Sequence, residues 1–237
     1  MTAKRVAPPS IRTTLLIDAM YFHAANQSYD QALRHQKGIE KAERVTSRLN
    51  ERRDRILATY ENDHWEAYDD LEPIYIQMES ADYGLGMAYG PFLQSLASVH
   101  ILCAASLESH INTSGREHLS QKHFELFERF SLEAKWITFP KLLGLAGFDP
   151  GTEPFQGFSR LVRFRNVLIH YKGRIEDWQP PGVPSFLNEL GLTETDARRS
   201  LETVKGIITK LAKQFGEDEP FWLRHKGDIS YFEVVVK

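Results

Sequence analysis

Residues 163–174, with the sequence RFRNVLIHYKGR, place an arginine, an asparagine and a histidine close together. Asn166 and His170 are four residues apart, so on a helix their side chains would share one face. Arg165 would lie about 140° around the helix from His170 and would reach the same cleft only through its long side chain. A histidine is suited to proton transfer near neutral pH, and an arginine is suited to stabilising negative charge on phosphoryl oxygens.

The same stretch is locally basic. Between residues 159 and 174 the basic residues have no acidic neighbour; they are Arg160, Arg163, Arg165, Lys172 and Arg174. On a chain with a net charge of -3, this is a local patch of the kind that contacts a phosphate backbone. Two other interpretations stay open: the arginines pair with acidic residues at 61–82, or the segment is an ordinary helix end, where His170 caps carbonyls and Arg165 forms a salt bridge with Glu108.

Helical spacing dominates the chain, so the sequence predicts an all-α fold. Four core helices are expected between residues 92 and 216. The first is residues 92–112, the second follows Gly115 and continues toward Leu143, and the third runs from about Pro154 to Gly173. The fourth is capped by Thr193 and stopped by Gly216. Pro-bearing and Gly-bearing loops separate the last three helices.

The N-terminal third is expected to form an additional helical hairpin. Residues 34–55 hold eight Lys/Arg and four acidic residues, whereas residues 61–82 hold eight acidic residues and no Lys/Arg. The two arms would complement each other in an antiparallel pair, although such runs are more often solvated faces. Gly84, Gly86 and Gly90-Pro91 predict a break. We therefore expect an appendage at 1–90, a bundle at 91–216, and a tail or short strand at 217–237, because ISYFEVVVK is rich in β-branched and aromatic residues.

Composition narrows the classes of function. The 237 residues are 42% hydrophobic, which is enough for an ordinary globular core. Cys103, the single cysteine, lies in an apolar run and has no partner for an intramolecular disulfide. The sequence contains no spacing typical of a metal site, no phosphate-binding glycine loop and no nucleophile elbow. It also contains no recognisable signal peptide or membrane span, so we expect a cytoplasmic protein without a cofactor.

The run RNVLIHY, near the end of the third of four helices, resembles the Arg-x(4–6)-His signature of the HEPN superfamily. The runs ASLESHIN and FSLEAKW resemble the first two core helices of bacterial HEPN-like proteins, in which an acidic residue of the first helix faces the motif. The resemblance covers about residues 90–216. Tyr171 follows the histidine directly, where many nuclease members carry one more residue.

The resemblance implies a helical bundle that dimerises so that two copies of the motif face each other. For active members it implies metal-independent cleavage of RNA, in a toxin-type effector of stress or defence. His170 would accept the proton of a ribose 2′-hydroxyl, Arg165 would stabilise the phosphoryl charge, Asn166 would orient the histidine or bind phosphate, and Glu108 would hold the imidazole. RNA contacts are expected from Arg160, Arg163, Tyr171, Lys172 and Arg174. The alternative is a non-catalytic module that binds a nucleotide, or a partner protein through the N-terminal helices.

Overall fold

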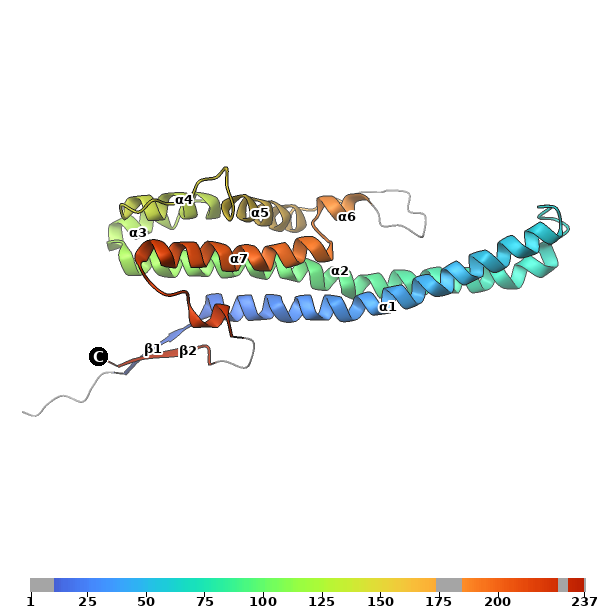
Figure 1. The fold of residues 1–237 in the computed structure, drawn as a ribbon, viewed down its shortest axis with the longest axis horizontal. Helices are drawn as coiled ribbons and strands as arrows, with labels where there is room; N and C mark the ends of the chain where they lie inside the picture. Colours follow the sequence, from blue (N-terminus) through green and yellow to red (C-terminus); the bar gives the residue numbers. More distant parts are fainter. Residues whose placement is uncertain (1–10, 174–184, 226–229, 237) are drawn as a thin grey trace, which may run out of the picture. The chain divides into compact units, whose positions relative to one another are not determined.

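A computed structural model describes residues 11–173, 185–225 and 230–236. Within these residues the chain is mostly helical, with one two-stranded sheet (Figure 1). This confirms the all-α class in its broad form, while the HEPN-like arrangement stays a prediction. The elements are β1 (Ile11–Leu15), α1 (Ile17–Thr59), α2 (Tyr68–His118), α3 (Gln121–Phe127), α4 (Leu132–Leu142), α5 (Phe155–Ile169), α6 (Ser185–Glu189), α7 (Glu194–Phe215), the 3-10 helix η1 (Phe221–Leu223) and β2 (Phe232–Val236).

The chain forms two compact units that interleave in sequence. The first unit comprises Met1–Ala25, Ile101–Val162 and Ser200–Lys237, and the second comprises Asn26–His100 and Arg163–Arg199. Helices α1, α2, α5 and α7 therefore each contribute residues to both units. These units do not follow the expected boundaries at residues 90 and 216, which stay a prediction about domains that fold independently.

The first unit contains the two-stranded sheet. Strands β1 and β2 pair antiparallel, with Ile11 opposite Val236 and Leu15 opposite Phe232 (Figure 1). The backbone N–H of Leu16 donates to the carbonyl of Tyr231 at 2.8 Å and extends this pairing. The C-terminal strand was therefore correctly predicted as one of two alternatives. Its partner was missed, because the five residues of β1 merge without a turn signal into the start of α1.

Aromatic side chains fill the core of the first unit. Trp136 is fully buried, and its ring centroid lies 5.7 Å from that of Phe148 and 6.0 Å from that of Phe158. At the start of α1, the carboxylate of Asp18 accepts a hydrogen bond from the backbone N–H of Ala19 and forms a 2.8 Å ion pair with His110. These contacts fix the start of α1 against α2, since a partly buried acid needs such partners.

The expected second core helix consists of two helices. Ser120 caps α3 by accepting from the N–H of His123, and Ser131 caps α4 by accepting from the N–H of Ala134. A serine that bonds the backbone in this way starts a new helix, which periodicity alone does not reveal. The other expected helices are close to the structure: α5 begins at Phe155, and Thr193 caps α7 through the N–H of Asp196.

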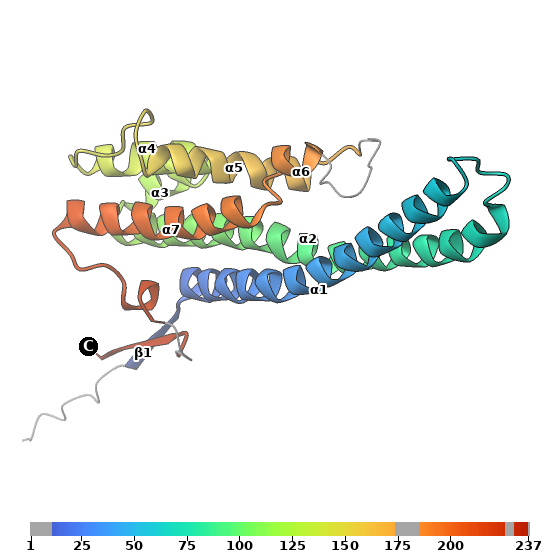
Figure 2. The same cartoon turned by 45° about the vertical axis from the view of Figure 1, so that its right-hand side comes forward.

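The second unit contains a long helical hairpin, which we call the α1–α2 hairpin and which consists of residues 26–100. Its two helices run antiparallel and side by side (Figures 1 and 2). The hydroxyl of Tyr89 donates to Glu43 at 3.2 Å, and that of Tyr60 donates to Asp70 at 2.7 Å. The predicted hairpin is thus present. Among the described residues, however, no salt bridge joins the basic stretch 34–55 to the acidic stretch 61–82.

The predicted break at residues 84–91 is wrong, because α2 is continuous from Tyr68 to His118. A glycine inside a helix costs only about 1 kcal/mol relative to alanine. The buried face of the helix continues through the break, with Leu85 and Leu96 both fully covered. Packing against α1 therefore outweighs the local preference of Gly84, Gly86 and Gly90-Pro91.

By length and composition alone, α2 meets the requirements of a membrane-spanning helix, contrary to the expectation that no segment does. A buried core helix meets the same requirements. In the structure the apolar part of α2 contributes the fully buried Leu96, Cys103 and Leu107 to the cores.

Candidate functional site

The last turn of α5 is anchored in the second unit by Phe164. This side chain is 3% exposed, and its ring centroid lies 5.0 Å from that of His100, a buried residue of α2. The Nε2 of His100 bonds the carbonyl of Gly191 at 2.7 Å, so its N–H donates to that carbonyl. Burial lowers the pKa of His100, only partly offset by the Gly191 bond and the charge of Asp196. A neutral histidine thus joins α2, α5 and the segment after α6.

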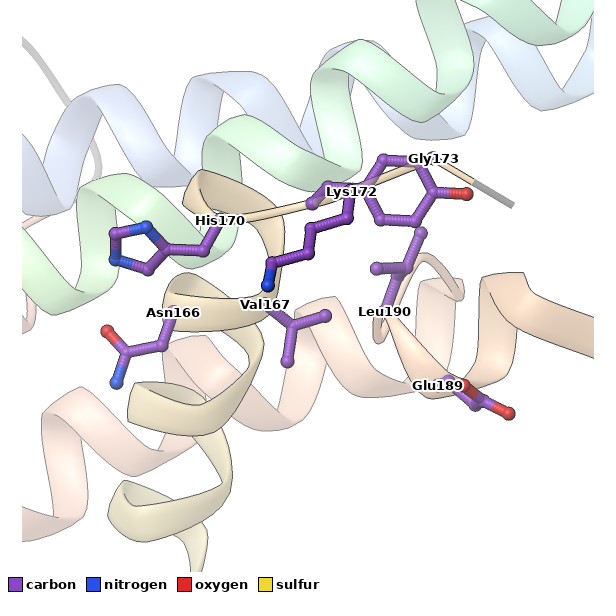
Figure 3. A pocket seen from close by; sticks show the side chains of 8 residues that line it. Asn166, Val167, His170, Lys172, Gly173, Glu189 and Leu190 are labelled. Atoms are coloured by element: carbon purple, nitrogen blue, oxygen red, sulfur yellow. The ribbon is translucent and has the colours of Figure 1, made fainter.

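A pocket of ≈ 440 Å³ opens at the end of α5 (Figure 3). Asn166 and His170 line it from the same side, as their four-residue spacing predicts. The helix ends here: the N–H of His170 still bonds the carbonyl of Asn166 at 3.0 Å, and Gly173 adopts a positive φ of 75°. The side chain of His170 is exposed, so a large ligand would reach it.

Arg165 does not line the pocket but is linked to it. Its Nη1 donates a hydrogen bond to Oδ1 of Asn166 at 3.0 Å. The expectation that a long side chain must reach around the helix is consistent with this geometry, since the guanidinium meets Asn166 and not the imidazole directly. Asn166 therefore stands between the charged arginine and the pocket.

The other basic residues of the motif differ in their surroundings. Lys172 lines the pocket, and in Figure 3 its side chain extends back toward Val167. Tyr171 also lines the pocket and is 43% exposed. Arg163 lies on the far side of the same turn, with its guanidinium carbon 5.1 Å from the ring centroid of Phe164. Arg174 lies outside the described residues.

Glu108 and Arg160 belong to the first unit, whereas the pocket is formed wholly by the second. Glu108 is a half-buried residue of α2, and Arg160 is a half-buried residue of α5. Their expected roles, in holding the imidazole and in contacting RNA, stay predictions. Near Glu108, the side-chain oxygen of Asn112 accepts a hydrogen bond from the buried Lys135 at 2.9 Å.

Sequence reasoning missed the opposite wall of the pocket. This wall is formed by Glu189 and Leu190 at the end of α6. In Figure 3, Glu189 points away from Asn166 and His170, so its carboxylate does not face the imidazole. The two residues follow a Pro-bearing segment, and no periodic pattern placed them beside α5. Within the described residues, no group of three or more His, Cys, Asp or Glu side chains is arranged to hold a metal ion.

Comparison with protein-family models, with curated proteins and with solved structures gives no match. The functional interpretation therefore depends on the residues of the site and their geometry.

Proposed function

We propose that this protein is a HEPN-type endoribonuclease that cleaves RNA without a metal ion, with His170 as its general base. The observation that carries the proposal is the arrangement at the end of α5. There, Asn166, His170 and Lys172 line one open pocket, and Arg165 is hydrogen-bonded to Asn166. This set provides a titratable base, an amide and two cations at one exposed place, and the surrounding stretch contains no acidic residue in sequence.

The proposed reaction is an internal transesterification. The ribose 2′-oxygen forms a bond to the adjacent phosphorus, and its proton passes to the neutral imidazole of His170. The bond from phosphorus to the 5′-oxygen of the next nucleotide breaks, and that oxygen takes up a proton from water or from the imidazolium. The products are a 2′,3′-cyclic phosphate and a 5′-hydroxyl end, with no change in oxidation state.

The cations would stabilise the charge that develops on the phosphoryl oxygens. Arginine is suited to this role because its planar guanidinium stays protonated and presents several fixed donors. Its bond to Asn166 leaves the remaining N–H groups of Arg165 for phosphate, while the Asn166 amide keeps its own N–H groups for the substrate. Lys172 would bind a neighbouring phosphate, and the exposed ring of Tyr171 would stack on a base.

The test is a cleavage assay with purified full-length protein, structured and unstructured RNA, and a chelator that removes divalent cations. We expect cleavage by the wild type and a loss of about 10²–10⁴-fold in the His170→Ala variant. His225→Ala is the matched control, because His225 is also exposed and its only contact is a backbone hydrogen bond. Equal activity of His170→Ala and His225→Ala, or complete loss of cleavage with chelator, would refute the mechanism.

A second candidate function, a non-catalytic module that binds a partner protein, is favoured by the outer face of α2. Ile76, Tyr83 and Met87 follow at intervals of seven and four residues and are 63%, 72% and 61% exposed. Apolar side chains at this spacing are typical of helix-in-groove recognition. A complex that resists high salt, together with an absence of RNA cleavage, would choose this function. Homodimerisation and a cytoplasmic, toxin-type role belong to the proposed nuclease as expectations from the family resemblance.

A further inference from the structure

The outer face of α1 in the α1–α2 hairpin carries an unbroken row of cations. Its members recur at intervals of three or four residues and all are exposed; they are Arg34, Lys37, Lys41, Arg44, Arg48, Arg52 and Arg55. We call this row the cationic ridge. At about 1.5 Å per residue it is roughly 32 Å long.

The ridge lies opposite the face that α1 packs against α2. Ile39 and Thr46 are buried on that inner face, 5% and 6% exposed. Arg48 is nine residues from Ile39, which at about 100° per residue places it half a turn away, on the solvent side. The hairpin thus holds the ridge straight without using its side chains for packing.

The ridge is not neutralised by the acidic residues of the chain. Among the described residues, no salt bridge or hydrogen bond joins a ridge side chain to an acidic side chain. Arg34 and Arg55 donate only to the backbone carbonyls of Asp30 and Glu51, one turn earlier. The basic residue of this stretch that does form an ion pair, Arg53, pairs with Asp54 and lies outside the ridge. The ridge therefore keeps its charge for an external ligand.

The chemistry of the ridge selects a polyanion over a protein or a membrane. Helix-in-groove docking requires apolar anchors at three- and four-residue intervals, and the ridge positions carry none. Binding at a membrane surface requires an apolar face opposite the cations, and on α1 that face is already buried against α2. A row of arginines and lysines along one helix suits a chain of phosphates, which releases bound counterions on contact.

We propose that the cationic ridge binds the phosphate backbone of RNA and so holds long RNA on the same unit that carries the His170 pocket. This inference deepens the proposed function and depends on it for the identity of the polyanion. It assigns to the hairpin a sequence-independent role in binding, separate from the chemistry at the end of α5. Substrates too short to reach the ridge gain nothing from it.

The test measures binding separately from cleavage. All proteins carry His170→Ala, so that a labelled single-stranded RNA of about 30 nucleotides stays intact during fluorescence anisotropy titrations at several salt concentrations. The ridge variant adds Arg44→Gln and Arg48→Gln. The matched control adds Lys122→Gln and Arg129→Gln, which remove the same charge from exposed positions in the first unit.

We expect the ridge variant to bind RNA at least tenfold more weakly than the parent. We also expect the slope of log affinity against log salt to fall by about 1.4, since each lost phosphate contact on a single strand removes about 0.7. The control variant should match the parent in both. Equal binding by the ridge and control variants overturns the proposal, and so does a change of oligomeric state in the ridge variant without a change of RNA affinity.

A second arm separates this inference from the nuclease proposal. With the His170 side chain restored, the ridge variant should cleave a dinucleotide as fast as the wild type but cleave the long RNA more slowly. An equal loss on both substrates contradicts a ridge role. If the wild type cleaves neither substrate but the ridge still governs salt-dependent RNA binding, the nuclease proposal fails and the ridge proposal stands.

Discussion

Arg165 and Asn166, adjacent in the chain, are joined by a hydrogen bond of 3.0 Å from the guanidinium Nη1 to the amide Oδ1. Adjacent residues on a helix point about 100° apart, so only a long side chain can make this contact. The bond holds the arginine beside the pocket that Asn166 and His170 line. In the proposed mechanism, Asn166 therefore positions Arg165 as well as contacting substrate.

We predict that Asn166→Ala lowers the single-turnover rate of RNA cleavage by about tenfold, because it frees Arg165 but leaves the base in place. This loss is smaller than the one expected for His170→Ala. Val167→Ala, a truncation in the same pocket that removes no polar group, should change the rate less than twofold. A loss as large in Val167→Ala as in Asn166→Ala would mean that pocket shape, and not the amide, matters.

We predict that stability falls as the pH is lowered below about 6.5, because of His100. Burial lowers the pKa of His100 below its ordinary value of 6.5 in the folded protein, so the unfolded chain takes up the proton first. The stability that the neutral histidine provides is complete above pH 6.5. It is lost toward the lower folded pKa at up to about 1.4 kcal/mol per pH unit.

Urea unfolding of wild type and His100→Gln at pH 7.5, 6.5 and 5.5 measures this effect. Glutamine keeps a donor for the carbonyl of Gly191 but does not titrate. The difference in unfolding free energy between the two proteins should therefore change with pH in favour of the variant as the solution becomes acidic. A constant difference across the three pH values would show that His100 does not control acid stability.

We predict that Gly191→Ala destabilises the protein by about 2–4 kcal/mol. Gly191 has a φ of 70°, which costs a side-chain-bearing residue about 1 kcal/mol, and an added Cβ would lie 2.6 Å from the ring of Phe164. Gly144→Ala is the control, since its φ is 74° and an added Cβ meets nothing within 4 Å. Thermal or urea unfolding should give a loss of only about 1 kcal/mol for Gly144→Ala. Similar losses in both variants would exclude the overlap with Phe164 as a cause.

We predict that Cys103 does not react with thiol reagents in the native protein. Its side chain is fully buried in α2, and burial raises the pKa of its thiol, so neither access nor thiolate is provided. Titration with a chromogenic disulfide reagent should give no signal in buffer and one thiol per chain in denaturant. Rapid reaction under native conditions would show that the helix opens around Cys103.

Periodicity and capping chemistry predicted the α-helices that carry strong local signals. Thr193 and the apolar steps that follow it located α7, and the loop before Pro154 located the start of α5. The same reasoning failed at Gly84–Pro91, because the continuous packing of α2 on α1 is a tertiary effect that local propensity does not contain. It also missed β1, whose pairing with β2 joins the two ends of the sequence.

The candidate site was predictable in part for the same reason. The four-residue interval between Asn166 and His170 is a local property of a helix, so their shared face followed from the sequence. Glu189 and Leu190 form the opposite wall only because the chain returns after α6, which no spacing reveals. The ridge at Arg34–Arg55 was visible as an excess of basic residues. That its cations face solvent without acidic partners was not, because it depends on how α1 packs on α2.

The central claim is tested most directly with a DNA oligonucleotide that contains one ribonucleotide, incubated with the wild-type protein and a chelator. The proposed mechanism requires a single 2′-hydroxyl next to the broken bond. It therefore predicts one cut, directly 3′ of the ribonucleotide, that leaves a 2′,3′-cyclic phosphate and a 5′-hydroxyl, and no such cut with His170→Ala. Cutting of the all-DNA control, a 5′-phosphate product, or an equal cut by His170→Ala would contradict it.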